Sequence, residues 1–437
     1  MLLFVKTQAQ LIIIAALFSI VGVGILALSS AQERSRLFIE AETASTTAFR
    51  GTDQAASGGQ HLEFGAMNPA DRYSHAHTRY VAVNGNDTHD GSLNSPWATL
   101  QAAVERSPVD TLIRVQPGTY YQDTTIISRS NLTIVGDSTV QNRPHFIGVE
   151  YVVITMSDAT YITIDNLKVE GTTPAGRESN WGTPIGLNTG IGNIGDVHHI
   201  TIRNNELIGR ESSAAGIQSN NNNPYTAGRV LDYITIEDNV IHGKGDEYLG
   251  IQNNVGPSGI SMYYLKSLDD KPGPHVVIRR NYIYQVGQLV PSTGIGSSVI
   301  TDGNGIIFDL NDPHGYDQRC DVYLNVISSV GAAGILAFRS SQEINSFNNT
   351  IVDYGRNKPQ TTGILMGNGS QRVWNNILIG GTKKHPSITS VAQRGVNLGF
   401  STAEGAHNLS FDPLLDDPLG TVRSAGSFSP LSTSQVG

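Results

Sequence analysis

Short segments in which hydrophobic and polar residues alternate recur along most of the chain, and each ends in asparagine. The clear copies are Tyr161–Asn166, His199–Asn205, Tyr233–Asn239 and His275–Asn281. Weaker copies end at Asn325, Asn349 and Asn376. Alternation with a period of two, with β-branched residues at the apolar positions, is typical of strands that bury one face. Because the steps between copies are unequal, they fit β-helix coils with loops of different length rather than helical repeats of fixed length.

The repeated asparagines have a structural interpretation. At the same bend of stacked coils, each amide side chain can bond to the asparagine of the next coil, so that a ladder runs along the solenoid. We expect this role for them in place of a catalytic one. The lone Cys320 excludes an intrachain disulfide, and we expect it to be a buried strand residue rather than a nucleophile.

A second repeat, a glycine followed by isoleucine, lies between the first. Its copies begin at Gly216, Gly259, Gly305, Gly334 and Gly363. Because side chains alternate across a strand, each isoleucine should point inward, together with Met262, Phe308, Ala337 and Met366. The outward positions are then Ser261 and Tyr263, Ile307 and Asp309, and Leu336 and Phe338. If the coils stack in register, Tyr263, Asp309 and Phe338 form one outward column with a step of about 4.8 Å.

A helix is predicted just before the repeats begin. Ser95 is a suitable N-cap and Pro96 a suitable first helical residue. Trp97, Leu100 and Val104 then give an apolar face at helical spacing. A short amphipathic helix at this point can cover the open end of a solenoid, which needs such a cap.

The stretch from Tyr80 to Tyr121, with its Asn-Gly-Asn-Asp and Pro-Trp-Ala-Thr-Leu elements, resembles the N-terminal signature of right-handed parallel β-helix proteins of the pectate-lyase-like superfamily. The resemblance implies an all-β, single-stranded right-handed parallel β-helix with a short N-terminal capping helix. Lyases, hydrolases, epimerases and non-enzymes share this scaffold, so the resemblance implies no single reaction.

The ends of the chain bear on its location. Residues 1–31 contain the apolar stretch Leu11–Leu28 followed by Ser-Ser-Ala, which predicts a signal peptide or an uncleaved membrane anchor. Residues 32–78 are expected to be a connector with a remnant resembling a carbohydrate-binding β-sandwich module. The β-helix should span 79–415 and a tail 416–437. The protein is therefore expected to be secreted or membrane-anchored and extracytoplasmic, with the N-terminal segment as its sole membrane contact.

Charge narrows the choice of partner. The net charge is −9, with 29 basic and 38 acidic residues and no run of lysine or arginine. Such a chain repels nucleic acid. An extracellular acidic polysaccharide remains the expected partner, because a local basic cleft or a bound cation can override the global sign. The expected state is a monomer.

The segment Thr301–Asp309 resembles an Asp-Gly-Asn-Gly-Ile run of uncharacterised β-helix proteins. β-Elimination on a uronate needs a group that neutralises the carboxylate, a base and an acid. We expect Ca²⁺ to neutralise it, held by hard oxygen ligands. The candidate metal ligands are Asp302, Asn304 and Asp309. The candidate catalytic residues are Lys266, His275, Tyr263 and Arg339. The candidate substrate-binding residues are Tyr264, Phe338 and His314. The structural alternative is a tight turn at 302–305 that leads into a strand.

Three other functions stay open. Asp312-Pro-His314 matches the core tripeptide of mannuronan C5-epimerases. Asp302, Asp309, Asp312 and Asp317 could supply the two carboxylates of a glycoside hydrolase. Alternatively, outward Tyr263, Tyr264 and Phe338 would stack on sugars without catalysis, as in an adhesin. If Tyr263 and Asp309 share a cleft with Lys266 and His275, an enzyme is favoured; if these groups lie on different faces, a binding protein is favoured.

Overall fold

The computed structural model of the chain describes residues 49–52, 60–63, 68–148, 152–171, 183–188, 195–209, 214–219, 228–243, 258–286, 303–312, 315–340, 342–355, 363–366, 371–380, 396–397, 404–406, 408–411 and 429–431. The chain divides into two units, Met1–Met67 and Asn68–Gly437. In the first unit, β1 (Phe49–Thr52) pairs antiparallel with β2 (Gln60–Glu63). Within the described ranges no helix is long and apolar enough to cross a membrane, and the stretch Leu11–Leu28 lies outside them.

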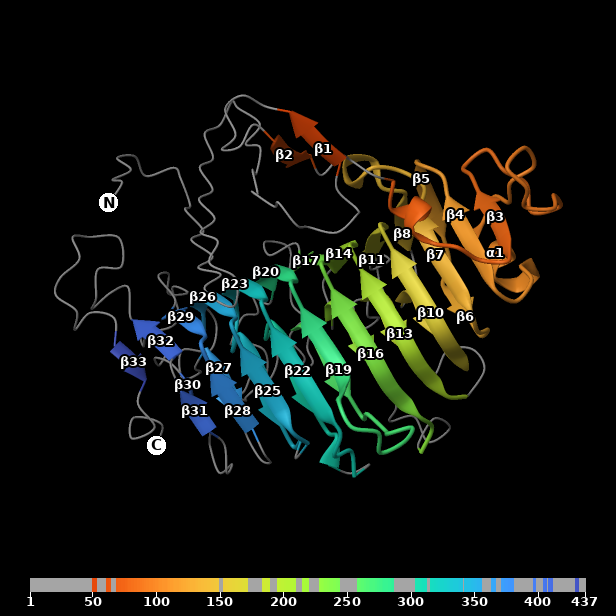
Figure 1. Cartoon of the computed structure of the whole chain (residues 1–437). Coiled ribbons are helices and arrows are strands. Elements are labelled where there is room, and N and C mark those ends of the chain that lie inside the picture. Colours follow the sequence, from red (N-terminus) through yellow and green to blue (C-terminus); the bar gives the residue numbers. More distant parts are fainter. Residues whose placement is uncertain are drawn as a thin grey trace, which may run out of the picture. The chain divides into compact units, whose positions relative to one another are not determined.

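The second unit consists of three sheets whose strands are visited in turn (Figure 1). The first sheet contains β3 (His77–Val81), β4 (Thr111–Val115), β7 (Leu132–Gly136), β10 (Ala159–Asp165), β13 (Val197–Arg203), β16 (Leu231–Glu237), β19 (Pro274–Arg279), β22 (Arg319–Tyr323), β25 (Ile344–Phe347), β28 (Gln371–Trp374) and β31 (Glu404–Ala406). The second sheet contains β5 (Thr119–Gln122), β8 (His145–Gly148), β11 (Lys168–Gly171), β14 (Glu206–Gly209), β17 (Val240–Gly243), β20 (Tyr282–Val286), β23 (Val326–Val330), β26 (Thr350–Tyr354), β29 (Ile377–Gly380), β32 (Asn408–Phe411) and β33 (Ser429–Leu431). The third sheet contains β6 (Thr125–Ile127), β9 (Val152–Met156), β12 (Thr183–Leu187), β15 (Ala214–Ser219), β18 (Ser258–Tyr263), β21 (Ile306–Asp309), β24 (Ile335–Phe338), β27 (Ile364–Met366) and β30 (Val396–Asn397).

From β4 to β30 each coil of the solenoid contributes one strand to each sheet, and neighbouring coils pair in parallel. For example, β4, β5 and β6 form one coil before the chain returns to the first sheet at β7. The exception is β33, which pairs antiparallel with β32. The fold is therefore a right-handed parallel β-helix, as the sequence predicts.

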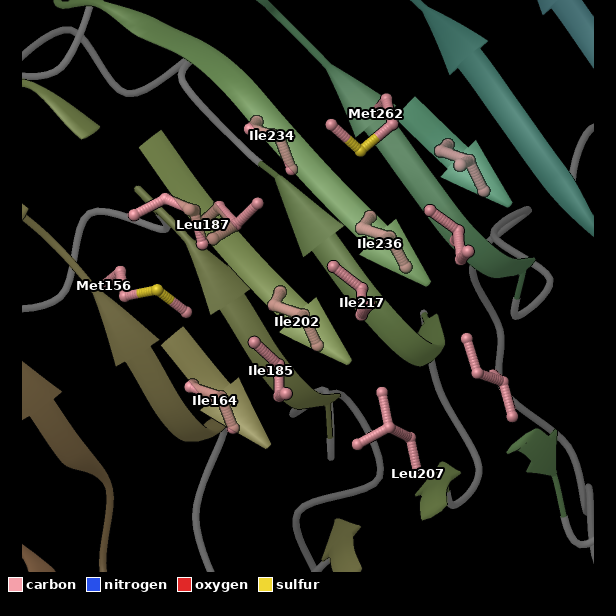
Figure 2. Packing of buried hydrophobic residues seen from close by; sticks show 14 of the residues in the cluster. Met156, Ile164, Ile185, Leu187, Ile202, Leu207, Ile217, Ile234, Ile236 and Met262 are labelled. Carbon is pink, nitrogen blue, oxygen red and sulfur yellow. The ribbon is translucent and has the colours of Figure 1, made fainter. Parts of the chain in front are cut away.

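The core consists of inward side chains that stack from coil to coil. Ile164, Ile202 and Ile236 are register partners on adjacent strands of the first sheet, and each is fully buried. Figure 2 shows them facing Ile185 and Ile217 of the third sheet. The alternation of apolar and polar residues thus places a continuous column of apolar side chains on the inward face of each sheet.

The asparagine ladder is confirmed. The side-chain amide of each ladder asparagine except the last donates to the side-chain oxygen of the asparagine in the next coil, at 3.0–3.1 Å. Backbone N–H groups of the ladder donate to the same oxygens. The members are Asn205, Asn239, Asn281, Asn325, Asn349 and Asn376. Cys320 is also buried in β22, as expected.

The helix prediction needs a correction at its start. The helix α1 covers Leu100–Arg106 and its N-cap is Thr99, not Ser95. Trp97 is extended, because its backbone pairs with Val81 of β3, and Pro96 therefore precedes the helix. The short 3-10 helices η2 (Pro69–Arg72) and η3 (Val140–Asn142) complete the described helices. Leu100 and Val104 of α1 join the core cluster, so the helix covers the first coil.

Candidate functional site

The outward column predicted on the third sheet is present. Tyr263 at the end of β18 pairs with Asp309 of β21, and Asp309 pairs with Phe338 of β24. The three side chains therefore follow one another in successive coils. The glycine–isoleucine repeats fix this register, since the isoleucines after Gly259, Gly305 and Gly334 are all buried.

The other outward-pointing residues of β18, β21 and β24 are shielded from solvent. Ser261 and Ile307 are 1% exposed and Leu336 is 9% exposed. Ile307 and Leu336 belong to a small apolar cluster separate from the core, and Tyr263 packs against that cluster. The outward column thus borders a covered apolar patch instead of an open flat sheet.

A second column consists of the residues that come one position after those of the first, and the strand pattern does not predict it. Tyr264, Leu310 and Arg339 each come directly after a strand and adopt φ values of 56°, 56° and 47°. The left-handed conformation at these bends is uncommon for residues other than glycine and asparagine. It redirects the chain, and with it the side chain of Arg339, which contacts the preceding coil.

Arg339 forms a two-pronged ion pair with Asp309. Its Nε donates to Asp309 Oδ1 at 3.0 Å and its Nη2 donates to Oδ2 at 2.9 Å. The carboxylate is buried, with 12% of the side chain exposed, whereas 51% of the Arg339 side chain is exposed. A guanidinium in this geometry presents its remaining N–H donors to solvent beside a neutralised carboxylate.

Burial and the ion pair shift the pKa of Asp309 in opposite directions. Burial raises the pKa of Asp309 above its ordinary value of 3.8, although hydrogen bonds from Arg339 lower it. The bonds to Asp309 raise the pKa of Arg339, so the guanidinium stays charged. Because the pKa of Asp309 is higher in the folded state, its contribution to stability is full below pH 3.8 and decreases as the pH rises through the folded value.

Aromatic side chains lie beside the ion pair. The Arg339 guanidinium carbon lies 4.9 Å from the centroid of the Phe338 ring, a cation–π contact. Phe338 is 51% exposed. Burial raises the pKa of Tyr264, which also feels the charges of Arg339 and Asp309.

The proposed calcium ligands are already engaged in the protein's own bonds. Asn304 is 1% exposed, and its side-chain oxygen accepts the backbone N–H of Ala333 at 3.1 Å. Both Asp309 oxygens bond to Arg339. Among the described residues no group of three or more histidine, cysteine, aspartate or glutamate side chains could hold a metal. Asn304 and Asp309 do not fit a calcium site in this arrangement. Asp302 and His314 lie outside the described residues.

One of the candidate catalytic residues, His275, lies on a different sheet from Asp309. His275 belongs to the first sheet and is 2% exposed. Its Nδ1 bonds to Asp232 at 2.8 Å and its Nε2 to the carbonyl of Lys271 at 3.0 Å. Lys266 lies in the connection from β18 to β19, where its backbone pairs with Leu231. The structure thus joins Tyr263, Tyr264, Asp309, Phe338 and Arg339, and places His275 on another sheet.

Replacing Arg339 with alanine should raise the pKa of the Asp309 carboxyl further, because the ion pair that lowers it is lost. Arg339 supplies the largest contributions that oppose the effect of burial. A ¹³C NMR titration of aspartate side-chain carboxyls in the wild type and R339A measures the shift. As a control, Arg372→Ala on β28 should leave the pKa unchanged; an unaltered pKa in R339A would show that the ion pair does not set it.

No family model and no curated protein matches this chain. Among solved structures, the chain is similar to a rhamnogalacturonan lyase, with 14% identity, 76% of this chain and 87% of that one covered, and a TM-score of 0.38. The pectate lyase Pel9A is 13% identical, with 77% of this chain and 81% of that one covered and a TM-score of 0.40. An alginate lyase from Paenibacillus sp. is 14% identical, with 76% of this chain and 94% of that one covered and a TM-score of 0.40. At these identities and TM-scores the similarity does not bear on function, and the fold assignment rests on the three parallel sheets.

Proposed function

We propose that the chain is an extracytoplasmic β-helix protein that binds an acidic, uronate-containing polysaccharide at Arg339. The observation that supports this most directly is the half-exposed guanidinium held between Asp309 and the Phe338 ring. Arginine binds carboxylates in a planar, two-pronged geometry. An exposed aromatic ring beside it can stack on the face of the same sugar. The apolar N-terminal stretch supports export, which would bring the protein to such a glycan.

Binding is preferred to catalysis because of where the candidate groups lie. His275 is buried in the first sheet and both of its ring nitrogens are bonded. It is therefore not available to take a proton from a sugar at Arg339. Tyr263 and Tyr264 lie near the ion pair and carry transferable protons, and burial raises the pKa of Tyr264 further above neutral pH.

Lyase activity by β-elimination is the second candidate. The position of Arg339 favours it, because neutralising the uronate carboxylate acidifies the C5 proton without a metal ion. Tyr263 stands in the same column as Asp309; as the tyrosinate it would take the C5 proton and, as the C4=C5 double bond forms and the C4–O bond breaks, give that proton to the leaving oxygen. C5-epimerisation begins with the same proton removal, and would differ in returning the proton to the other face. Calcium is not needed in either scheme.

Binding is tested by calorimetric titration of the protein with hexamers of galacturonate, mannuronate and guluronate. We expect one of them to bind, and Arg339→Ala to weaken its affinity at least about tenfold, or about 1.4 kcal/mol. Arg372→Ala is the matched control: Arg372 is likewise more than half exposed but lies on the first sheet. Equal affinity in the wild type and R339A, or no binding of any uronate hexamer, would contradict the proposal.

The reaction is tested on the same hexamers by the ultraviolet absorbance of the unsaturated uronate product. Binding without this product would exclude lyase activity on that hexamer. If product forms, Tyr263→Phe should abolish it while leaving the affinity within about twofold, because the ring stays and only the hydroxyl is lost. Product formation that Tyr263→Phe leaves intact would exclude Tyr263 as the proton-transfer group.

A further inference from the structure

A column of left-handed residues also runs along the first sheet, one in each of five successive coils. Asp110, Asn131, Tyr161, His199 and Tyr233 have φ values of 60°, 58°, 56°, 57° and 49°. They precede or interrupt β4, β7, β10, β13 and β16, which lie side by side in Figure 1. Asparagine and aspartate tolerate this conformation, whereas tyrosine and histidine rarely adopt it. The rings at three of these positions therefore suggest a use for the side chains themselves.

The rings in this column stack on one another. Ring centroids are 4.5 Å apart for Tyr161 and His199, 4.6 Å for His199 and Tyr233, and 4.1 Å for Tyr233 and His275. Within the stack each ring face is covered by the next ring, so a ligand can reach ring faces only at the two ends. His275 closes one end and is 2% exposed, whereas Tyr161 at the other end is 53% exposed.

The stack stops at Tyr161 because the next two coils carry small polar residues at this position. Asn131 is adjacent to Tyr161, since Leu132 and Ile162 are register partners, and Asp110 occupies the coil beyond it. Among the described residues no ring covers the second face of Tyr161. Asn131 and Tyr161 line one groove, so the second face of the Tyr161 ring borders this groove where the stack ends.

A groove with a volume of about 450 Å³ runs along the stack, from Asp110 beyond Tyr161 to His275 at the other end, and this volume is within the usual range for a small-molecule site. Its polar end wall is fixed: His75 Nδ1 bonds to Asp110 Oδ1 at 2.7 Å, and His75 Nε2 bonds to Thr133 Oγ1 at 2.9 Å. The floor is a row of register partners in four successive coils. These partners are Thr133, Thr163, Thr201 and Thr235.

We infer that this groove is a second carbohydrate-binding site, which takes a neutral pyranose on the open face of Tyr161. A pyranose presents an apolar face to an aromatic ring and hydroxyls at its rim. Threonine hydroxyls, the Asn131 amide and the Asp110 carboxylate are suitable partners for those hydroxyls. The lining contains a carboxylate and no lysine or arginine, so a uronate is disfavoured here. The site goes beyond the function proposed above and does not depend on it.

The inference is tested by calorimetric titration of the full chain with cellohexaose, mannohexaose and xylohexaose. We expect one hexaose to bind, and Tyr161→Asn to lower the affinity for it at least about tenfold. Asparagine tolerates the left-handed backbone and occupies the same position one coil earlier. Tyr161→Phe keeps the ring and should bind within about twofold of the wild type. Tyr121→Asn, at a tyrosine 76% exposed on β5, should bind as the wild type does.

A second measurement keeps the test valid if Tyr161→Asn folds poorly. In protein labelled at tyrosine ring carbons, the Tyr161 resonance is identified by its loss in Tyr161→Phe, and it should shift when the hexaose is added. No binding of any neutral hexaose, unchanged affinity in Tyr161→Asn, or a Tyr161 resonance that does not respond would each overturn the inference. Because the uronate hexamers and Arg339 variants are not used, failure here is separate from failure of the proposed function.

Discussion

Replacing Asn281 with alanine should lower the free energy of unfolding by about 3 kcal/mol or more. Asn281 is 1% exposed and stands in the middle of the ladder. Its amide donates to Asn325 Oδ1 and to the carbonyl of Ile236, both at 3.0 Å. Its oxygen accepts the backbone and side-chain N–H groups of Asn239 at 3.1 and 3.0 Å. Alanine would remove these four bonds, and each buried group that finds no other partner costs about 1–3 kcal/mol.

Urea unfolding followed by circular dichroism measures this change. Asn142→Ala serves as the control, because Asn142 is exposed at the end of η3, and it should change the stability by less than about 0.5 kcal/mol. If Asn281→Ala and Asn142→Ala unfolded at the same urea concentration as the wild type, the ladder would not be a source of stability.

The second large effect is expected for Gly305→Ala, which should lower the free energy of unfolding by about 2–3 kcal/mol. A Cβ at this position would lie 2.6 Å from the carbonyl oxygen of Gly334 and 2.6 Å from Ile327 Cγ2. The oxygen belongs to the backbone of the next coil, so the coils would have to move apart. Since β21 begins at the next residue, the shift would also disturb Asp309.

Gly363→Ala is the matched comparison for Gly305→Ala. The nearest atoms to a Cβ at Gly363 are side-chain atoms of Leu378 and Tyr354, both at 3.1 Å, and these can adjust by a few tenths of an ångström. The loss should stay below about 1 kcal/mol. Equal losses for the two variants in urea unfolding would mean that the close approach of glycine to the next coil is not what the repeat requires.

The fold and one column of the candidate site could be predicted from sequence because both depend on periodicity. The glycine–isoleucine copies determine which residue of each strand points inward, so Tyr263, Asp309 and Phe338 align without knowledge of the loops between them. The asparagines were predictable for the same reason. A register fixed in every coil by a buried face leaves no freedom to slip by one residue.

The contacts that complete the site could not be predicted in this way. Arg339 reaches Asp309 because it adopts a left-handed conformation, which nothing in an Ala-Phe-Arg-Ser sequence indicates. His275 looked like a candidate base, but it bonds to Asp232, a residue 43 positions earlier. The start of α1 was misplaced since Ser95 and Pro96 satisfy the local rules for a cap, whereas the pairing of Trp97 with Val81 is a tertiary contact.

The central claim is that an acidic sugar binds at the guanidinium of Arg339, and the most direct test is an NMR titration of arginine side chains. In ¹⁵N-labelled protein the Arg339 Nε–Hε signal is assigned by its absence from the spectrum of Arg339→Lys. Addition of the uronate hexamer that binds in calorimetry should shift this signal in a saturable way, while the signal of Arg372 stays in place. A hexamer that binds and leaves the Arg339 signal unmoved would contradict the proposed site.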